Sequence, residues 1–179
     1  THGQRDVPAL PPGLTYVEVA ASWRHSAARR SDGTVVAWGS NAAGQCDVPP
    51  LPPGLTYVEI AAGYENTLAR RSDGMVVAWG DNSMGQCGVP APPQGMTYVE
   101  IAAGADYTTG GLRRSNTLAR RSDGAIVVWG DTSSGQADLP PLPPGIGLES
   151  LSAGGLFTAA LLGGGGPVCP SPGTYCVAK

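Results

Sequence analysis

The sequence predicts an all-β protein, a β-propeller of four-stranded blades with about 41 residues per repeat. One observation is an internal repeat, in which "LTYVEVAAS" begins at Leu14, "LTYVEIAAG" at Leu55 and "MTYVEIAAG" at Met96, each 41 residues after the last. The others are short β-rich runs separated by turn signals, and no helical periodicity. A β-solenoid is the alternative, but its repeats are usually shorter and lack two tight turns per unit.

Each unit contains four candidate strands. In the second unit, "TYVEIAAG" has the β-branched and aromatic residues of a strand, and "NTLARR" and "MVVAWG" flank "SDG". An Asp-Gly pair between two such runs signals a hairpin, because Gly accepts a positive φ at no steric cost. "GQCGVP" can form a short fourth strand, whereas the Pro-rich "PPLPPG" is a stiff connector that cannot join a sheet ladder.

The repeats also set the domain organisation. Residues 1–162 form the propeller, and residues 163–179 form a Gly-rich link and a Cys-containing C-terminal tail. We expect three complete blades and a fourth that is split between the two ends, with "GQRDVP" completing the blade begun at Ile146. The unit boundaries lie near 14–54, 55–95, 96–145, and 146–162 with 1–13.

The segment "VEIAAGYENTLARRSDGMVVAWGDNSMGQCGVP" resembles the repeat of the RCC1 (regulator of chromosome condensation) family. The family pattern is an inner strand ending in Ala-Ala-Gly, a His-Thr/Ser-Leu-Ala strand, an Asp-Gly turn, a strand ending in Trp-Gly, and Asn-x-x-Gly-Gln. His25 falls on the family's His position, and Asn66 and Asn116 replace it in later units. The resemblance is closest to short-repeat bacterial members, and it implies an RCC1-type propeller, usually seven-bladed.

This chain of 179 residues is too short for seven such units. The chain could be part of a longer protein, several copies could complete a ring, or four blades could close alone. An unclosed propeller exposes an apolar blade face and an open sheet edge. We therefore favour a ring that is completed by more protein.

A Trp followed by Gly recurs in each complete unit, at Trp38, Trp79 and Trp129. A site normally occurs once per chain, whereas a large aromatic side chain at a fixed place in every blade suits packing between blades. We interpret these residues as structural.

The charged residues follow the repeat as well. "ARRSDG" supplies an Arg pair in three units, and Leu161-Leu162 replaces that pair in the fourth. Because adjacent strand residues point to opposite faces, at most one Arg of each pair could join a phosphate- or heparin-binding stripe. We favour ion pairs between blades, made with the carboxylates that mark the inner strands, Glu18, Glu59, Glu100 and Glu149.

The four cysteines divide into two kinds. Cys46 and Cys87 occupy equivalent places in successive units, so they should lie too far apart to pair, and we expect small, partly buried residues. Cys169 and Cys176 lie in "CPSPGTYC", a tight loop that favours a disulfide and hence an oxidising compartment. Two free thiols in a tail are the alternative. Neither pair is accompanied by a further Cys or His pair at the spacing that a zinc site requires.

Composition and motifs exclude several function classes. The net charge of −3 provides no positive field for nucleic acid, and no stretch is apolar enough to span a membrane. No motif in the sequence supplies a nucleophile and an orienting group for either histidine. The "GGGG" run lacks the Gly-Lys-Ser/Thr ending of a phosphate-binding loop, and the acidic residues do not have the spacing of a Ca²⁺-binding loop. We expect no enzyme activity, no cofactor and no metal.

The one irregularity inside the repeat is a nine-residue insertion between Glu100 and Asn116, in "ADYTTGGLRRSN". It should emerge at one rim of the propeller, where binding function is commonly placed on a rigid scaffold. A neutral tandem slip is the alternative, since "LRRSN" echoes "LARRS". The candidate partner-binding rim comprises Trp23, Tyr64, Tyr107, Arg113 and Arg114.

We therefore predict an interaction module, secreted or at the cell surface, that contacts a protein partner or further copies of itself. Carbohydrate binding through rim aromatics is one alternative. The resemblance to bacterial members also permits a secreted enzyme inhibitor that acts through the propeller face. Nucleotide exchange on a small GTPase is associated with the eukaryotic members, and this sequence supplies no basic chromatin-binding tail.

Overall fold

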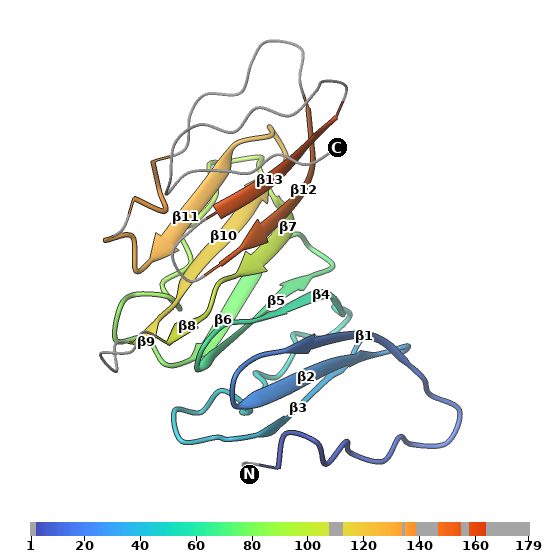
Figure 1. The fold of residues 1–179 in the computed structure, drawn as a ribbon. Helices are drawn as coiled ribbons and strands as arrows, with labels where there is room; N and C mark the ends of the chain where they lie inside the picture. Colours follow the sequence, from blue (N-terminus) through green and yellow to red (C-terminus); the bar gives the residue numbers. More distant parts are fainter. Residues whose placement is uncertain (1–2, 108–112, 134, 139–146, 155–157, 164–179) are drawn as a thin grey trace.

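The computed structural model describes residues 3–107, 113–133, 135–138, 147–154 and 158–163 (Figure 1). Within these ranges every regular element is a β-strand, as predicted. Three antiparallel three-stranded sheets follow one another along the chain, and we call them blades 1, 2 and 3. Blade 1 comprises β1 (Tyr16–Ala21), β2 (His25–Arg30) and β3 (Val35–Gly39).

Blade 2 repeats this arrangement, and blade 3 repeats it with an interruption. Blade 2 comprises β4 (Tyr57–Ala62), β5 (Asn66–Arg71) and β6 (Val76–Gly80). Blade 3 comprises β7 (Tyr98–Ala103), β10 (Asn116–Arg121) and β11 (Ile126–Gly130). The insertion between β7 and β10 carries β8 (Asp106–Tyr107) and β9 (Arg113–Arg114). The fourth unit comprises β12 (Gly147–Ala153) and β13 (Thr158–Gly163).

The Asp-Gly pairs form the predicted hairpin turns. In blade 1, Gly33 has φ 79° and Asp32 Oδ1 accepts a hydrogen bond from the Thr34 backbone N–H at 2.9 Å. Gly74 and Gly124 repeat the turn with φ 78° and 87°. A short acceptor followed by a residue that tolerates positive φ thus closes each hairpin between the second and third strands.

The fourth strand expected over "GQCDVP" and "GQCGVP" does not form. Residues 41–47 fold into consecutive turns in which Gly44 has φ 80° and the Cys46 backbone N–H donates to Asn41 Oδ1 at 2.8 Å. The Asp47 backbone N–H donates to the Gly44 carbonyl at 3.0 Å. Because these turns use the donors that a ladder would need, the segment cannot pair with β3.

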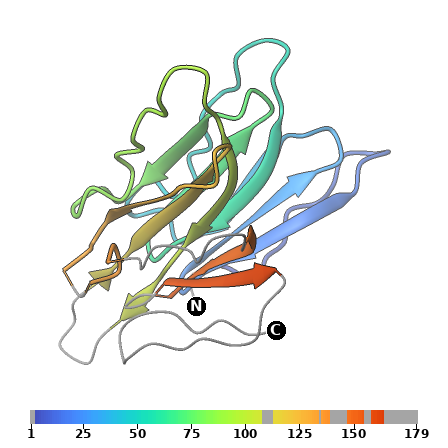
Figure 2. The ribbon, with the colours of Figure 1, turned by 90° about the horizontal axis from the view of Figure 1, so that it is seen from above.

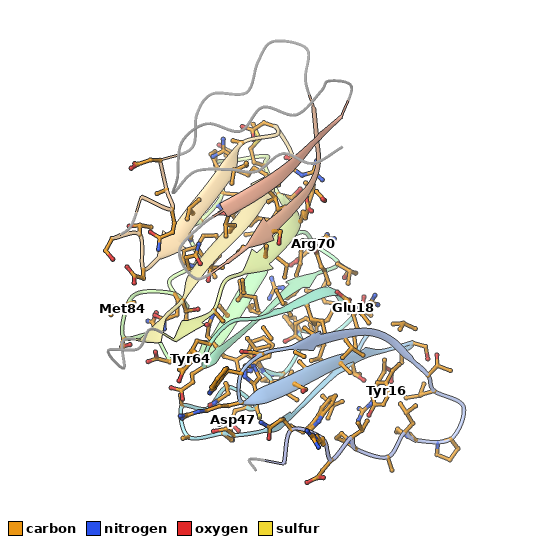
Figure 3. The ribbon with its side chains drawn as sticks, in the orientation of Figure 1. Tyr16, Glu18, Asp47, Tyr64, Arg70 and Met84 are labelled. Atoms are coloured by element: carbon orange, nitrogen blue, oxygen red, sulfur yellow. The ribbon has the colours of Figure 1, made fainter. Side chains whose placement is uncertain are left out.

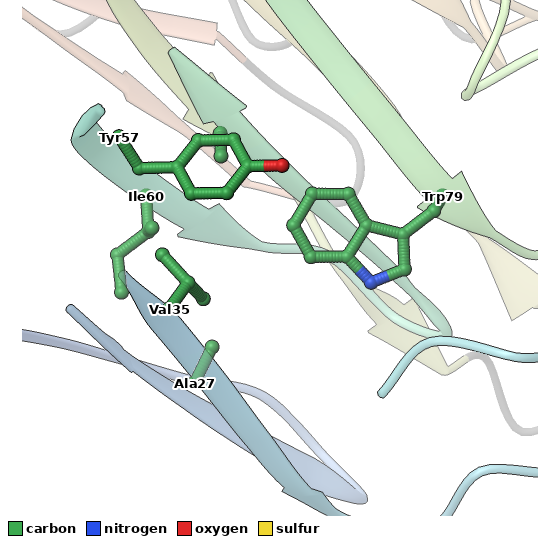
Figure 4. Close-up of a cluster of buried hydrophobic side chains, with 6 residues drawn as sticks. Ala27, Val35, Tyr57, Ile60 and Trp79 are labelled. Carbon is green, nitrogen blue, oxygen red and sulfur yellow. The ribbon is translucent and has the colours of Figure 1, made fainter. Parts of the chain in front are cut away.

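The hydrophobic core lies between blades. One cluster joins Ala27 and Val35 of blade 1 to blade 2, and Figure 4 shows the Trp79 indole beside the Tyr57 ring within it. The blade 2 members are Tyr57, Ile60, Ala69 and Trp79. A second cluster repeats the pattern between blades 2 and 3, with Leu68, Val76, Tyr98, Ile101, Ala119 and Trp129. Each blade is therefore held by its neighbour rather than by a core of its own.

The blades succeed one another in chain order, with blade 1 at one end and β12–β13 at the other (Figure 1). Seen from above, blades 1 and 2 lie side by side (Figure 2). The N-terminal segment lies against blade 1, and its grouping with the fourth unit stays a prediction. The Gln4 carbonyl accepts a hydrogen bond from Trp38 Nε1 at 2.9 Å, just as the Gln45 carbonyl accepts one from Trp79 Nε1 at 3.0 Å.

Candidate partner-binding rim

The loops that leave the first and third strands of each blade lie together along one edge of the series of blades. The two kinds of loop are hydrogen-bonded to each other: the Ser40 backbone N–H donates to the Arg24 carbonyl at 2.9 Å, and Asp81 donates to Glu65 at 2.8 Å. We call this edge, with residues 22–24, 40–47, 63–65 and 81–87 and the β8–β9 hairpin, the loop rim. Figure 3 shows Tyr64 and Met84 on this edge, away from Tyr16 and Arg70.

The insertion forms a short antiparallel hairpin on the loop rim. Asp106 pairs with Arg114, and Tyr107 pairs with Arg113. The hairpin leaves blade 3 between the end of β7 and the start of β10, as the sequence predicted. The side chains of Tyr107, Arg113 and Arg114 lie outside the described residues, so their role in binding stays a prediction.

Trp23 and Tyr64 occupy equivalent positions, but only Trp23 is exposed. Its side chain is 61% exposed, whereas Tyr64 is 2% exposed. The Arg24 guanidinium of blade 1 lies 6.0 Å from the centroid of the Tyr64 ring, and Arg24 Nη1 pairs with Glu65 Oε1 at 3.1 Å. The prediction that Tyr64 offers a contact surface is wrong, because the preceding blade covers its ring.

Sequence reasoning missed Glu65, which is buried and holds Arg24 in place over Tyr64. A Glu with a 4% exposed side chain needs a cationic partner, and that partner comes from the preceding blade. The Ser22 hydroxyl also donates to the Gly63 carbonyl across the same junction. The only signal in the sequence was that two equivalent loop positions, 41 residues apart, both carry a charged residue, Arg24 and Glu65.

His25 lies at the base of the loop rim and is fully buried. The Thr67 hydroxyl donates to the Gln45 carbonyl at 2.8 Å, so its oxygen is left to accept from His25 Nε2, also at 2.8 Å. Nε2 therefore carries a proton, and because burial lowers the pKa of the imidazole from 6.5 to about 4, the ring is neutral at neutral pH. This bond links blade 1 to blade 2, so the role of His25 is structural.

The Glu–Arg pairs form within blades rather than between them, which corrects the sequence prediction. Arg29 Nε lies 2.7 Å from Glu18 Oε2, and the same pair recurs in blades 2 and 3. The second Arg of a pair binds its own hairpin turn, as Arg71 does with Asp73 at 2.6 Å. Arg121 pairs with Asp123 in the same way, whereas Arg30 Nη1 donates to Thr34 Oγ1 at 3.4 Å. Five of the six guanidinium groups are therefore occupied by carboxylates instead of forming a stripe for phosphate.

Cys46 and Cys87 are free, half-buried thiols. Each Sγ donates to the carbonyl of a nearby loop residue, Ser40 at 3.3 Å and Asp81 at 3.1 Å. Burial raises the pKa of both thiols, that of Cys87 to about 11, so neither is a reactive thiolate at neutral pH. Cys169 and Cys176 lie outside the described residues, and their disulfide stays a prediction.

No three His, Cys, Asp or Glu side chains within the described ranges gather closely enough to hold a metal ion. None of the residues in these ranges forms a helix with the length and apolarity that a membrane span requires.

The model of the Regulator of chromosome condensation (RCC1) repeat matches residues 16–45 and 57–86. These ranges run from the first strand of blades 1 and 2 to the Gln of the following turn. No curated protein matches the sequence.

Several solved structures share the fold. Yeast RCC1 (Prp20) in complex with Kap60 is 23% identical, with a TM-score of 0.67 over 86% of this chain and 42% of that one. Human WBSCR16 is 18% identical, with a TM-score of 0.68 over 87% and 48%. The CRINKLY WD40 ectodomain of the Arabidopsis thaliana receptor kinase ACR4 is 20% identical, with a TM-score of 0.62 over 86% and 51%. The chain spans about half the length of these structures, and the predicted propeller architecture is confirmed.

Proposed function

Because this chain belongs to the RCC1-repeat family of β-propellers, we propose that it is a non-catalytic interaction module that binds a protein partner through its loop rim. The observation that carries the proposal is the β8–β9 hairpin. It is the one feature of the described blades that the repeat does not require, and it projects from the edge where the loops gather. Added loops on a rigid scaffold are where binding residues are commonly placed.

The surroundings of the hairpin support a protein partner. Met84, on the same edge (Figure 3), is 46% exposed, and Met and Arg are both enriched at protein interfaces. Among the structural relatives, the yeast protein Prp20 was solved with Kap60 and studied for binding to Gsp1p and histones. Those partners belong to Prp20; what transfers to this chain is only the use of an RCC1 propeller as a protein-binding scaffold.

Carbohydrate binding has less support, because it called for one exposed aromatic side chain in each blade. Tyr64 is buried, and the side chain of Tyr107 lies outside the described residues. Inhibition of an enzyme through the propeller face is a special case of protein binding and is covered by the same test. A secreted or cell-surface location is part of the proposal and depends on the predicted Cys169–Cys176 disulfide.

Deletion of Asp106–Arg114 tests the proposal, because it restores the 41-residue spacing of the other units and should leave the scaffold folded. A photocrosslinking residue at Tyr107 should capture a discrete partner, and one at the exposed Pro53, which is not part of the loop rim, should not. Binding of the captured protein should weaken by roughly 30-fold or more on deletion, the loss of one hot spot. The unfolding midpoint should stay unchanged.

Unchanged affinity after the deletion would contradict the proposal and favour the alternative that the insertion is a neutral tandem slip. A glycan array read with the intact chain and with Tyr107→Ala separates the alternative. Sugar signals that disappear in the variant would replace protein binding with carbohydrate binding.

A further inference from the structure

The loop-rim turns that follow β3 and β6 each enclose the side chain of a buried Gln. Gln45 in blade 1 is 0% exposed and Gln86 in blade 2 is 2% exposed. In both turns the amide oxygen accepts a backbone N–H, from Ala43 at 2.9 Å and from Met84 at 2.8 Å. Because a backbone N–H can only donate, this contact fixes which end of each amide is the oxygen and leaves Nε2 as a donor at the other end.

In blade 2 the other end of the amide binds a carboxylate. Gln86 Nε2 donates to Asp81 Oδ2 at 2.8 Å, and the Ser83 backbone N–H donates to Asp81 Oδ1 at 3.1 Å. The Ser83 hydroxyl also donates to Asp81 Oδ2, at 2.9 Å. Blade 3 repeats this capping, since the backbone N–H and hydroxyl of Ser133 donate to Asp131 Oδ1 at 3.0 and 2.6 Å. A carboxylate is therefore the group that this turn binds in two blades.

Blade 1 has the same N–H donors but lacks the carboxylate. Ser40 stands at the position of Asp81, and Ala42 stands at the position of Ser83. Gln45 Nε2 is buried without a hydrogen-bond partner. In the part of the chain that the structure describes, no residue accepts from the Ala42 backbone N–H either. Two donors that meet on one carboxylate in blade 2 are thus left without it in blade 1.

The turn of blade 1 holds these donors in place. The Gln45 backbone carbonyl accepts from Thr67 Oγ1 at 2.8 Å and from Trp79 Nε1 at 3.0 Å, so blade 2 fixes the residue. The Asp47 carboxylate of the same turn (Figure 3) is held by Asn41, whose Nδ2 donates to Asp47 Oδ1 at 2.8 Å. A buried N–H without an acceptor is costly, so the turn favours an acceptor from outside.

The missing atoms also leave a way in. Ser has two heavy atoms fewer than Asp, and Ala42 lacks the hydroxyl that covers the carboxylate in blades 2 and 3. Ala42 is exposed and Ser40 is half-buried, so an acceptor can approach from solvent beside them. The Ser40 hydroxyl can donate as well. Because the groups that meet here are donors, the turn suits an anion rather than a cation.

We propose that the turn at residues 40–45 is a carboxylate-binding subsite of the loop rim, in which one oxygen of an acidic side chain of the protein partner accepts from Ala42 N–H and Gln45 Nε2. The proposal rests on the proposed function for the source of the carboxylate, and it names an acidic group as a feature of the partner. Deleting the β8–β9 hairpin leaves this turn intact, and a test with a free carboxylate needs no partner. The two proposals therefore fail separately.

Formate is the probe for the subsite, because it is the smallest free carboxylate. In heteronuclear NMR spectra the side-chain amide signals of Gln45 should shift saturably with sodium formate, with half-saturation above about 1 mM for so small a ligand. The Gln86 amide signals should stay in place, since Asp81 already occupies that nitrogen. An equal shift with sodium chloride at the same ionic strength, or no shift of Gln45, would overturn the proposal.

Matched variants should close the subsite in one blade and open it in another. Ser40→Asp gives blade 1 the carboxylate of blade 2 and should abolish the formate response of Gln45. Asp81→Ser with Ser83→Ala copies the turn of blade 1 into blade 2 and should give Gln86 the response. A response of Gln45 that survives Ser40→Asp would show that formate binds elsewhere and would overturn the assignment.

The protein captured through Tyr107 tests the source of the carboxylate. Its affinity should fall about tenfold for Ser40→Asp, because the new carboxylate fills the subsite and repels an acidic side chain. Ser40→Ala leaves both N–H donors open and should keep the affinity of the wild type. Unchanged affinity for Ser40→Asp would overturn the assignment of the carboxylate to the partner.

Discussion

Blades 1 and 2 have nearly the same sequence but very different surroundings. Val19 and Ile60 stand at the same strand position, yet one is 64% exposed and the other 6%. Trp38 is half-buried against the N-terminal segment, whereas Trp79 is buried between two blades. The comparison shows that a repeated side chain receives its structural role from the blade that precedes it.

The largest expected difference concerns the repeated Trp. Trp79→Ala should lower the free energy of unfolding by about 3–5 kcal/mol, because it empties the centre of a two-blade cluster. Trp38→Ala should lower it less, since part of that indole already contacts solvent. Urea unfolding of both variants measures the two losses. Equal losses would show that the preceding blade adds nothing to the role of the Trp.

The second difference is the buried His of blade 1, where blades 2 and 3 have Asn66 and Asn116. Because its folded-state pKa is lowered to about 4, the unfolded chain binds a proton first as the pH falls below 6.5. The titration of His25 leaves the free energy of unfolding unchanged above pH 6.5. It lowers that free energy between pH 6.5 and 4, by on the order of 3 kcal/mol for a pKa shift of this size. His25→Asn should remove this pH-dependent loss of stability.

The measurement is the free energy of unfolding of wild type and His25→Asn at several pH values between 7 and 4. Carboxylates titrate in both proteins, so only the difference between the two curves reports His25. Parallel curves would contradict the assigned role of the imidazole.

The smallest expected difference is between the effects of replacing two glycines in equivalent turns by Ala. Gly74 and Gly124 have φ 78° and 87°, so Ala costs about 1 kcal/mol of backbone strain at either position. A Cβ at Gly74 would also lie 2.6 Å from Thr97 Cβ in the next blade, whereas none of the described residues lies within 4 Å of one at Gly124. Gly74→Ala should therefore lose a further 1–3 kcal/mol or so. Matching thermal unfolding curves for the two variants would remove close blade approach as the cause.

The sequence by itself determined the architecture. A 41-residue period, an Asp-Gly pair between β-rich runs and a recurring Trp are local or periodic signals, and they predicted the first three strands of each unit, the hairpins and the stacking of blades, but not the absence of a fourth strand. The position of the insertion on one edge also followed, because it interrupts the chain at the end of an inner strand.

Only the tertiary structure decided how the repeated polar residues are used. The Glu–Arg pairs were expected between blades, but the bulge beside each Glu turns one oxygen to its own Arg and the other to the next blade. The exposure of Trp23 and the burial of Tyr64 depend on whether a blade precedes them, and no single repeat contains that information. Side-chain identity repeats along the chain, whereas solvent exposure and hydrogen-bond partners come from neighbouring blades.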